Sequence, residues 1–189
     1  DLNSSHNIIT SANYLSKGSI TPEEASLGAW ILTDGSFKIA KLSGKTSQGK
    51  DGNRQAYRAV IVQKKYVTEI YQLLERLGLD IIASKDSNDI FRWNIPQPFV
   101  RSLFKRAGLA DKKDSVKLVL SLSTEARKAF LETVCLAEGT QRKHGVWRIA
   151  QNSGDLCEAI KLAGFLEGFD IRTTKVIMKY NGKQHEQIT

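Results

Sequence analysis

Two acidic residues of this sequence stand where an acid is disfavoured. Asp34 ends the apolar run LGAWILTD, Glu138 ends LETVCLAE, and a glycine, Gly35 or Gly139, follows each acid. The pattern predicts that each carboxylate lies at a helix C-terminus, where unpaired carbonyl groups disfavour it by about 0.3–1 kcal/mol. A surface acid before a helix-ending glycine would explain either site alone. Carboxylate and backbone carbonyl oxygens are ligands that Mg²⁺ prefers, so the pair predicts a divalent-metal site.

The two acids belong to an internal repeat. LGAWILTDG (27–35) aligns with LETVCLAEG (131–139), AVIVQKK (59–65) with WRIAQNS (147–153), and LGLDI (77–81) with EGFDI (167–171). The change in offset falls in the first hairpin, where the Gly/Ser/Lys-rich loop of the first copy is replaced by a short turn. Surface loops tolerate insertions. The repeat therefore predicts two halves with the same order of elements.

Small residues mark one face of each acid-ending helix. Ala29 and Thr33 are four residues apart in the first helix, and Thr133 and Ala137 are four apart in the second. This spacing places each pair on one face of its helix and lets two helix backbones approach closely. We expect the two helices to pack together, which brings Asp34 and Glu138 side by side.

The remaining pattern predicts an α+β fold in which each half reads αββαββ(α). Thr21-Pro22-Glu23-Glu24 is a strong helix start, with a capping threonine, a first-turn proline and two acids. The other elements expected in the first half are strands over 36–42, 57–63, 81–85 and 90–95 and helices over 66–78 and 98–107. In the second half, strands are expected near 170–178 and 183–188. The domains predicted are an N-terminal arm (1–21), a first half (22–115), a linker (116–122) and a second half (123–189).

The charge balance favours a polyanionic partner. The chain has 28 Lys+Arg against 20 Asp+Glu, a net charge of +8, and its pI is near 9.5. The alternative at this point is a basic structural protein.

The cysteines and the hydropathy indicate the compartment. Cys135 and Cys157 lie in apolar helical patterns without CxxC spacing, so we expect buried free thiols of a reducing compartment. No signal peptide and no bilayer-spanning apolar run is visible, so an intracellular protein without a membrane partner is expected.

LGAWILTDG and LETVCLAEG resemble the two copies of the LAGLIDADG motif of homing endonucleases, and the resemblance covers residues 22–189. The first copy continues into the family's frequent DGSF ending. The second copy has Thr133 in place of a glycine, and Glu138 replaces the last aspartate while keeping an oxygen ligand. The resemblance implies a monomer whose strands form saddle-shaped antiparallel sheets over DNA. It also implies cleavage of both strands of double-stranded DNA at a long asymmetric site, in an element of intron or intein origin.

The resemblance also implies roles for individual residues. Asp34 and Glu138, with the backbone of Gly35 and Gly139, would hold Mg²⁺, for which Ca²⁺ or Mn²⁺ could substitute. Gln63 and Gln151 would be the polar residues that end a strand beside the metals. Lys112 or Lys113 would be the active-site lysine that stabilises charge around the attacked phosphate. The alternative for these two lysines is a solvated charge pair in a linker.

DNA contacts are expected on the hairpins, because a two-stranded ribbon fits the major groove. Most of these side chains would touch phosphate, which positions the protein without specifying sequence. The residues expected to bind DNA are Lys38, Lys41, Lys45, Lys50, Arg54, Arg58, Lys64, Lys65, Arg142, Lys143, Arg148, Lys175, Lys179 and Lys183. The alternative function is a catalytically inactive DNA- or RNA-binding relative, either a maturase or a regulator. The retained pair of acids favours the enzyme, because a pure binder gains nothing from two carboxylates that face phosphates.

Overall fold

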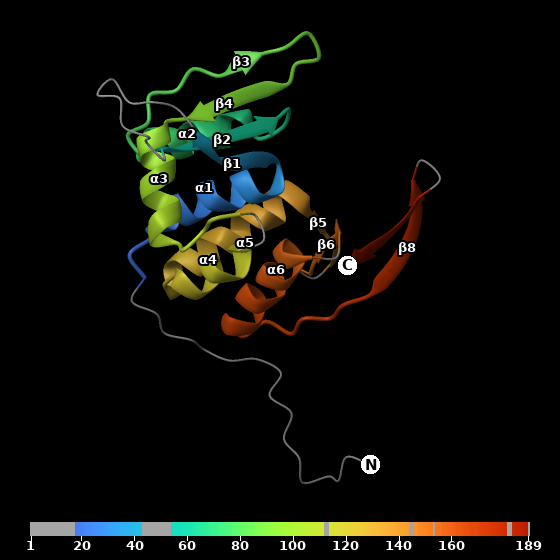
Figure 1. Cartoon of the computed structure of the whole chain (residues 1–189). Coiled ribbons are helices and arrows are strands. Elements are labelled where there is room, and N and C mark those ends of the chain that lie inside the picture. The colour runs from blue at the N-terminus through green and yellow to red at the C-terminus, as the bar shows by residue number, and fades with distance from the viewer. Residues whose placement is uncertain are drawn as a thin grey trace, which may run out of the picture.

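The computed structural model describes residues 18–42, 54–111, 114–143, 146–152, 154–180 and 183–188. The first part of the chain forms α1 (Pro22–Thr33), β1 (Gly35–Leu42), β2 (Arg54–Gln63), α2 (Val67–Arg76), β3 (Ser84–Lys85), β4 (Phe91–Ile95) and α3 (Gln97–Arg106). After α4 (Ser115–Ser121) come α5 (Thr124–Glu138), β5 (Gly139–Gln141), β6 (Trp147–Ile149), β7 (Gln151–Asn152), α6 (Asp155–Leu166), β8 (Lys175–Tyr180) and β9 (Lys183–Ile188). Helices and antiparallel sheets thus make up the α+β fold predicted from the sequence (Figure 1).

The strand order of the first half recurs in the second. The first sheet is antiparallel with the order β1-β2-β4-β3. The second half forms two separate sheets, β5-β6 and β7-β9-β8. If β6 and β7 are taken as one strand that is interrupted at Ala150, the order is the same. Helix α6 then corresponds to α2, and left-handed glycines follow both helices, Gly78 with φ 66° and Gly168 with φ 82°. This common order supports the internal repeat.

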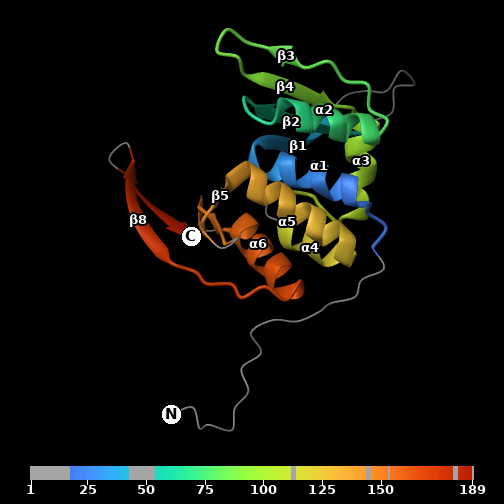
Figure 2. The ribbon, with the colours of Figure 1, turned by 180° about the vertical axis from the view of Figure 1, so that it is seen from behind.

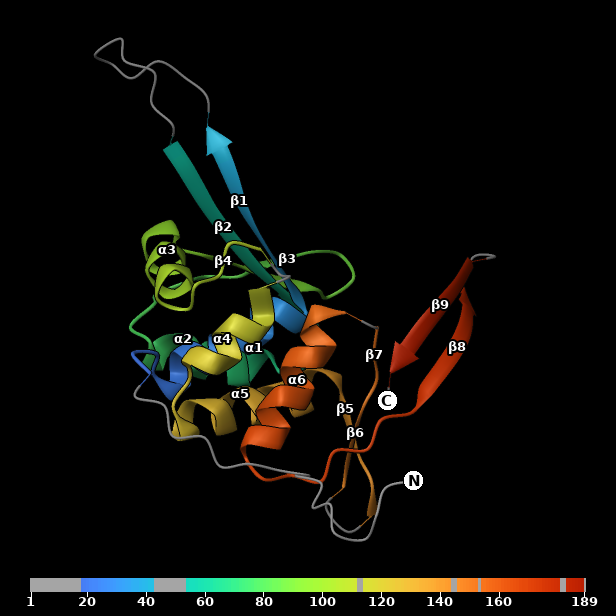
Figure 3. The same ribbon diagram turned by 60° about the horizontal axis from the view of Figure 1, so that its bottom comes forward.

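The second sheet departs from the single saddle expected for that half. Figure 3 shows the β8–β9 hairpin standing apart from the helices, whereas β5 and β6 form a separate small ribbon. In the first half, β1 and β2 pair over their full length, from Gly35 opposite Ile61 to Leu42 opposite Arg54. The equivalent pair in the second half, β5–β6, is much shorter.

The strand predicted over 81–85 is wrong for residues 81–83, because only Ser84 and Lys85 pair with β4. The backbone N–H of Ala83 donates to the hydroxyl of Tyr71 on α2 (3.2 Å), so this segment turns away from the sheet towards the helix. Ile82 is 90% exposed as a result.

Helix α1 begins where the sequence predicts. The hydroxyl of Thr21 accepts from the backbone N–H of Glu24 (3.2 Å), and the Glu24 carboxylate accepts from the Thr21 N–H (3.0 Å). This capping box satisfies two N–H groups that would otherwise be unpaired. Arg106 of α3 forms an ion pair with the same carboxylate and so ties the two helices together.

The segments predicted as arm and linker both contribute to the core. Ile20, near the end of the predicted arm (1–21), is 3% exposed and forms a parallel bridge with Leu122. Most of the predicted linker (116–122) is helix α4, whose Leu118 and Val119 are buried. Leu118, Val119 and the following Leu122 lie on one side of this helix and are fully buried, and burying that side favours a helix over an irregular connection.

Both cysteines are free thiols, as predicted. Cys157 is buried and Cys135 is half-buried, and burial raises the pKa of each thiol. In the part of the chain that the structure describes, no helix combines the length and apolar character needed to cross a bilayer.

Candidate active site

Helices α1 and α5 form the centre of the molecule and end together. Figures 1 and 2 show them side by side, with β1 and β5 leaving from the same end of the pair. The Ser26 hydroxyl of α1 donates to the Ala129 carbonyl of α5 (3.4 Å). Ser26 lies eight residues before Asp34, and Ala129 lies nine residues before Glu138. Because the helices run in the same direction from this contact, the two acids lie at the same end. Both residues are half-buried. A shared site for the two carboxylates stays a prediction.

The small residues of α1 and α5 leave few polar groups unsatisfied on the faces that were predicted to pack together. Ala29 is fully buried and Thr133 is 6% exposed. Thr33 donates its hydroxyl to the Ala29 carbonyl (2.9 Å), and Thr133 donates to the Ala129 carbonyl (2.8 Å). These bonds satisfy the hydroxyl groups within their own helices, so both faces can pack closely without an unpaired polar group.

Gly35 and Gly139 are required by close packing rather than by a left-handed helix cap. A Cβ at Gly35 would lie within 3 Å of the Ile31 backbone and the Val60 carbonyl. A Cβ at Gly139 would meet the Cys135 carbonyl and the Trp147 ring in the same way. Each strand thus leaves directly against the last turn of its helix. This geometry fixes the position of the acid just before the glycine.

Asp34 and Gln63 lie together, as the sequence predicts. The Asp34 backbone carbonyl accepts from Val62 N–H (3.1 Å), which places the end of β2 beside the end of α1. Gln63 Nε2 then donates to Asp34 Oδ2 (2.9 Å). The Gln63 side-chain oxygen accepts from the backbone N–H groups of Lys64 (2.8 Å) and Lys65 (3.0 Å). Both ends of the amide are therefore fixed, and the NH₂ group is directed to the carboxylate.

The second half repeats this register. Gly35 is opposite Ile61 and Gly139 is opposite Ile149, so in each half the glutamine comes two residues after the residue that faces the glycine. The Gln151 side-chain oxygen accepts from Asn152 N–H (3.2 Å), as Gln63 accepts from the residue that follows it. Gln151 is half-buried, like Gln63.

The oxygen donors at the helix ends are of the type that a hard divalent cation takes. Within the described ranges, no three His, Cys, Asp or Glu side chains gather as a metal site. The oxygen donors at the two helix ends are the carboxylates of Asp34 and Glu138 and the backbone carbonyls beside Gly35 and Gly139. Mg²⁺ is commonly bound in this way, by one or two carboxylates together with water and substrate phosphates.

Two cations face each other on the outer side of the first sheet. Lys38 on β1 is directly opposite Arg58 on β2, and both are exposed. Like charges at opposed positions destabilise a sheet pair by roughly 0.2–1 kcal/mol. This pairing is unfavourable in the protein alone and would become favourable next to a polyanion.

Two residues on this face were missed by the sequence prediction. Arg92 and Asn94 on β4 are exposed and lie opposite Val62 and Val60, on the same sheet face as Arg58. In FRWNI the apolar residues alternate with Arg92 and Asn94, and period-two alternation places those two on the outer face. That signal was available in the sequence. Arg92 also approaches the Asp86 carboxylate (3.6 Å).

The other residues predicted to bind DNA or to act in catalysis have varied positions. Lys64 donates from Nζ to the Asn88 carbonyl (3.0 Å), and Lys65 is exposed. Arg142, Lys143, Arg148 and Lys175 are also exposed. Four predicted residues, Lys41, Arg54, Lys179 and Lys183, are described by their strand backbone alone. Lys45, Lys50, Lys112 and Lys113 lie outside the described residues.

Comparison with known proteins identifies similar folds. No protein-family model and no curated protein matches the sequence. Among solved structures, I-DmoI in complex with DNA and Ca aligns with a TM-score of 0.52 at 17% identity, over 88% of this chain and 81% of that chain. The meganuclease I-SmaMI bound to DNA aligns at 0.48 and 13% identity, over 88% of this chain and 78% of that chain. The N-terminal LAGLIDADG domain of WhiA aligns at 0.45 and 12%, over 89% and 76%.

Proposed function

We propose that this chain, which has the fold of the LAGLIDADG homing endonucleases, is a divalent-metal-dependent endonuclease that cleaves double-stranded DNA at a specific site. The observation that carries the proposal is the repeated arrangement at the ends of α1 and α5. In each half an acid is followed by a glycine that close packing requires. That glycine pairs with an isoleucine on the next strand, and a glutamine follows two residues after the isoleucine.

The proposed roles follow from this arrangement. Asp34 and Glu138 would hold the cation at the junction of the halves, and the cation when bound would supply Lewis-acid stabilisation of the phosphodiester. Gln63 orients the Asp34 carboxylate through its fixed amide. Lys112 or Lys113 would stabilise charge on the attacked phosphate.

DNA would lie along the outer faces of the sheets. The opposed pair Lys38 and Arg58, with Arg92 and Asn94 on the same face, supports this placement in the first half. Arg142, Arg148 and Lys175 would extend the contact in the second half. Because the halves differ in sequence, the site would be asymmetric, and one chain would suffice as a monomer.

A binder without catalytic activity is the second candidate, and one observation favours it. The hydrogen bond from Gln63 partly satisfies the Asp34 carboxylate within the protein itself. The acid at this helix end is thus less dependent on a cation than the sequence alone suggests.

A cleavage assay separates the two candidates. The chain is incubated with Mg²⁺ and a library of randomised duplexes, which includes the uninterrupted insertion site of its own gene, and the new DNA ends are sequenced. Recurrent staggered cuts at one long sequence support the endonuclease. Selective retention of one duplex without any cut would support the binder.

A further inference from the structure

A cavity of about 820 Å³ lies in the second half beside α6. Its walls come from the end of the β5–β6 ribbon, from α6 and from residues 170–174. Sites that bury a small organic ligand span about 300–1,000 Å³. The cavity is therefore large enough for a nucleobase and its sugar.

Part of the lining of the cavity, called here its floor, is apolar. It consists of Ile149, Ile160 and Ile171 together with Cys157, which is 5% exposed. Burial raises the pKa of the Cys157 thiol, so this group stays neutral and packs as a small apolar side chain. Such a floor favours a flat, weakly polar group over water.

One wall of the cavity is aromatic. Trp147 is 41% exposed, whereas the other two tryptophans, Trp30 and Trp93, are at most 2% exposed. The Trp147 ring lies against Gly139, where a side chain would collide with it. Trp147 and Ile149 are on one face of β6 because side chains alternate along a strand. An aromatic surface thus lies beside the apolar floor.

The charged residues that line the cavity are mainly cationic. Arg142, Arg148, Lys161 and Arg172 line it, and Asp170 is the single acid among its lining residues. Lys161 is paired with Glu158 on α6 (2.8 Å), which leaves three arginines against Asp170. Asp170 approaches Arg172 (3.2 Å), but both side chains are largely exposed, and such pairs add little. The net charge of the lining residues is therefore positive.

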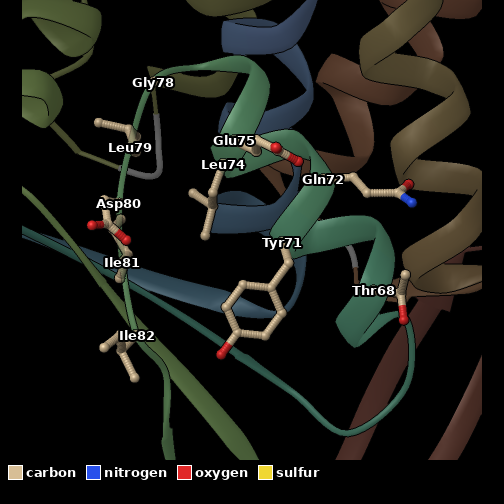
Figure 4. Close-up of a pocket in the computed structure, with 10 residues that line it drawn as sticks. All are labelled: Thr68, Tyr71, Gln72, Leu74, Glu75, Gly78, Leu79, Asp80, Ile81 and Ile82. Atoms are coloured by element: carbon tan, nitrogen blue, oxygen red, sulfur yellow. The ribbon is translucent and has the colours of Figure 1, made fainter.

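The first half contains a cavity whose charged lining residues are acidic. Figure 4 shows Glu75 and Asp80 beside the apolar side chains Leu74 and Ile81, and none of the residues lining that cavity is a lysine or arginine. Both cavities are partly apolar, but only the one in the second half suits an anionic ligand.

We propose that the cavity beside α6 receives one unpaired nucleobase of a nucleic-acid strand. The base stacks on Trp147 over the apolar floor, and the flanking phosphates lie against Arg142 and Arg172. Base–aromatic stacking with cationic contacts to the backbone is a general way of holding single-stranded nucleic acid. The inference rests on the proposed function for the identity of the polymer, since the same chemistry would also hold a free nucleotide.

The test compares two duplexes of one sequence, one fully paired and one with a single bulged 2-aminopurine. Binding is measured without divalent metal, together with the fluorescence of the bulged base. We expect the bulged duplex to bind about tenfold more tightly and the 2-aminopurine emission to be quenched, as stacking on an aromatic side chain implies.

Matched variants assign the effect to the cavity. Trp147→Leu should abolish the preference for the bulge, whereas Trp147→Phe should retain part of it, which separates lost stacking from misfolding. Tyr71→Leu is the control, because Tyr71 is a similarly exposed aromatic residue (37%) that lines the acidic cavity.

The outcomes distinguish this inference from the proposed function. Equal binding of both duplexes, with unchanged 2-aminopurine emission, overturns the inference alone. Failure to bind these duplexes and every duplex of the cleavage library overturns the proposed function as well. If dAMP displaces the base as effectively as the bulged duplex does, the cavity is a free-nucleotide site and the assignment to a strand is wrong.

Discussion

Gln63 donates from Nε2 to Oδ2 of Asp34 over 2.9 Å, while two backbone N–H groups hold its side-chain oxygen. The amide therefore cannot rotate without losing three hydrogen bonds. Gln63 is a positioning residue for the carboxylate at the end of α1. Under the proposed function Asp34 binds the cation, and residues that orient a metal ligand are typically worth about 10- to 100-fold in metal affinity or activity.

Replacing Gln63 by leucine should reduce cleavage by about 10- to 100-fold while DNA binding stays close to wild type. The reason is that Asp34 loses its fixed donor, whereas the outer face of the sheet is unchanged. Initial rates of plasmid nicking measure the effect at several Mg²⁺ concentrations. Gln72→Leu, at an exposed position on α2, is the control. Full activity of Gln63→Leu would show that the hydrogen bond is dispensable.

Alanine at Gly35 should destabilise the fold more than alanine at Gly78. A Cβ at Gly35 meets backbone atoms on two sides, and such overpacking costs about 1–3 kcal/mol or more. Gly78 has open space around it, so alanine there meets only the left-handed φ penalty of about 1–2 kcal/mol. Urea denaturation of both variants measures the difference. The reverse order of stability would contradict the steric role assigned to Gly35.

Lys38→Gln should have opposite effects on stability and on DNA binding. Removing one of two opposed cations should raise the free energy of unfolding by about 0.2–0.5 kcal/mol in the absence of DNA. The same change should flatten the slope of log affinity against log salt by about 0.9, the contribution of one phosphate contact. Arg101→Gln, on an exposed position of α3, should leave the slope unchanged. An unaltered slope for Lys38→Gln would remove Lys38 from the DNA surface.

Acid should destabilise the protein partly through Glu24. Burial opposes ionisation of this carboxyl, but hydrogen bonds from Arg106 and the Thr21 N–H outweigh it and hold the pKa below its ordinary value. A lowered pKa in the folded state gives stability that is present at neutral pH and is lost as the pH falls through that lowered pKa.

Glu24→Gln keeps an oxygen for the capping bond to Thr21 but loses the ion pair with Arg106. At neutral pH it should lower the free energy of unfolding by about 1–2 kcal/mol. Below the lowered pKa the two proteins should converge, since the wild-type carboxyl is then neutral too. Denaturation curves measured from neutral to acidic pH test this. Parallel curves would show that the ion pair does not stabilise the fold.

Much of the site could be predicted because local chemistry and the repeat point the same way. The Thr21 capping box and the paired acid–glycine endings are short-range signals, and equivalent positions in the repeat relate Gln63 to Gln151. The reason for the glycines could not be predicted in the same way. It depends on the approach of Val60 and Trp147 from other strands, which sequence spacing does not encode.

Other features depend on long-range packing. The helix over Ser115–Ser121 forms because its apolar face is buried in the core, although the segment resembles a linker in the sequence. Ile81–Ala83 has strand-like composition, but the Ala83 backbone N–H donates to the Tyr71 hydroxyl on α2 instead of pairing with a strand. The interruption at Ala150 and the division of the second half into two sheets, β5-β6 and β7-β9-β8, likewise leave no distinct signal in the residues themselves.

Whether Asp34 and Glu138 act jointly on a cation is tested most directly with Asp34→Asn and Glu138→Gln. Each change keeps the shape of the side chain and removes its charge. Cleavage in Mg²⁺ and DNA binding in Ca²⁺ are measured on the same duplex, with Asp80→Asn as an exposed control. We predict that both variants bind the duplex with near wild-type affinity and that neither cuts it. Normal cleavage by either variant would contradict a shared metal site at the ends of α1 and α5.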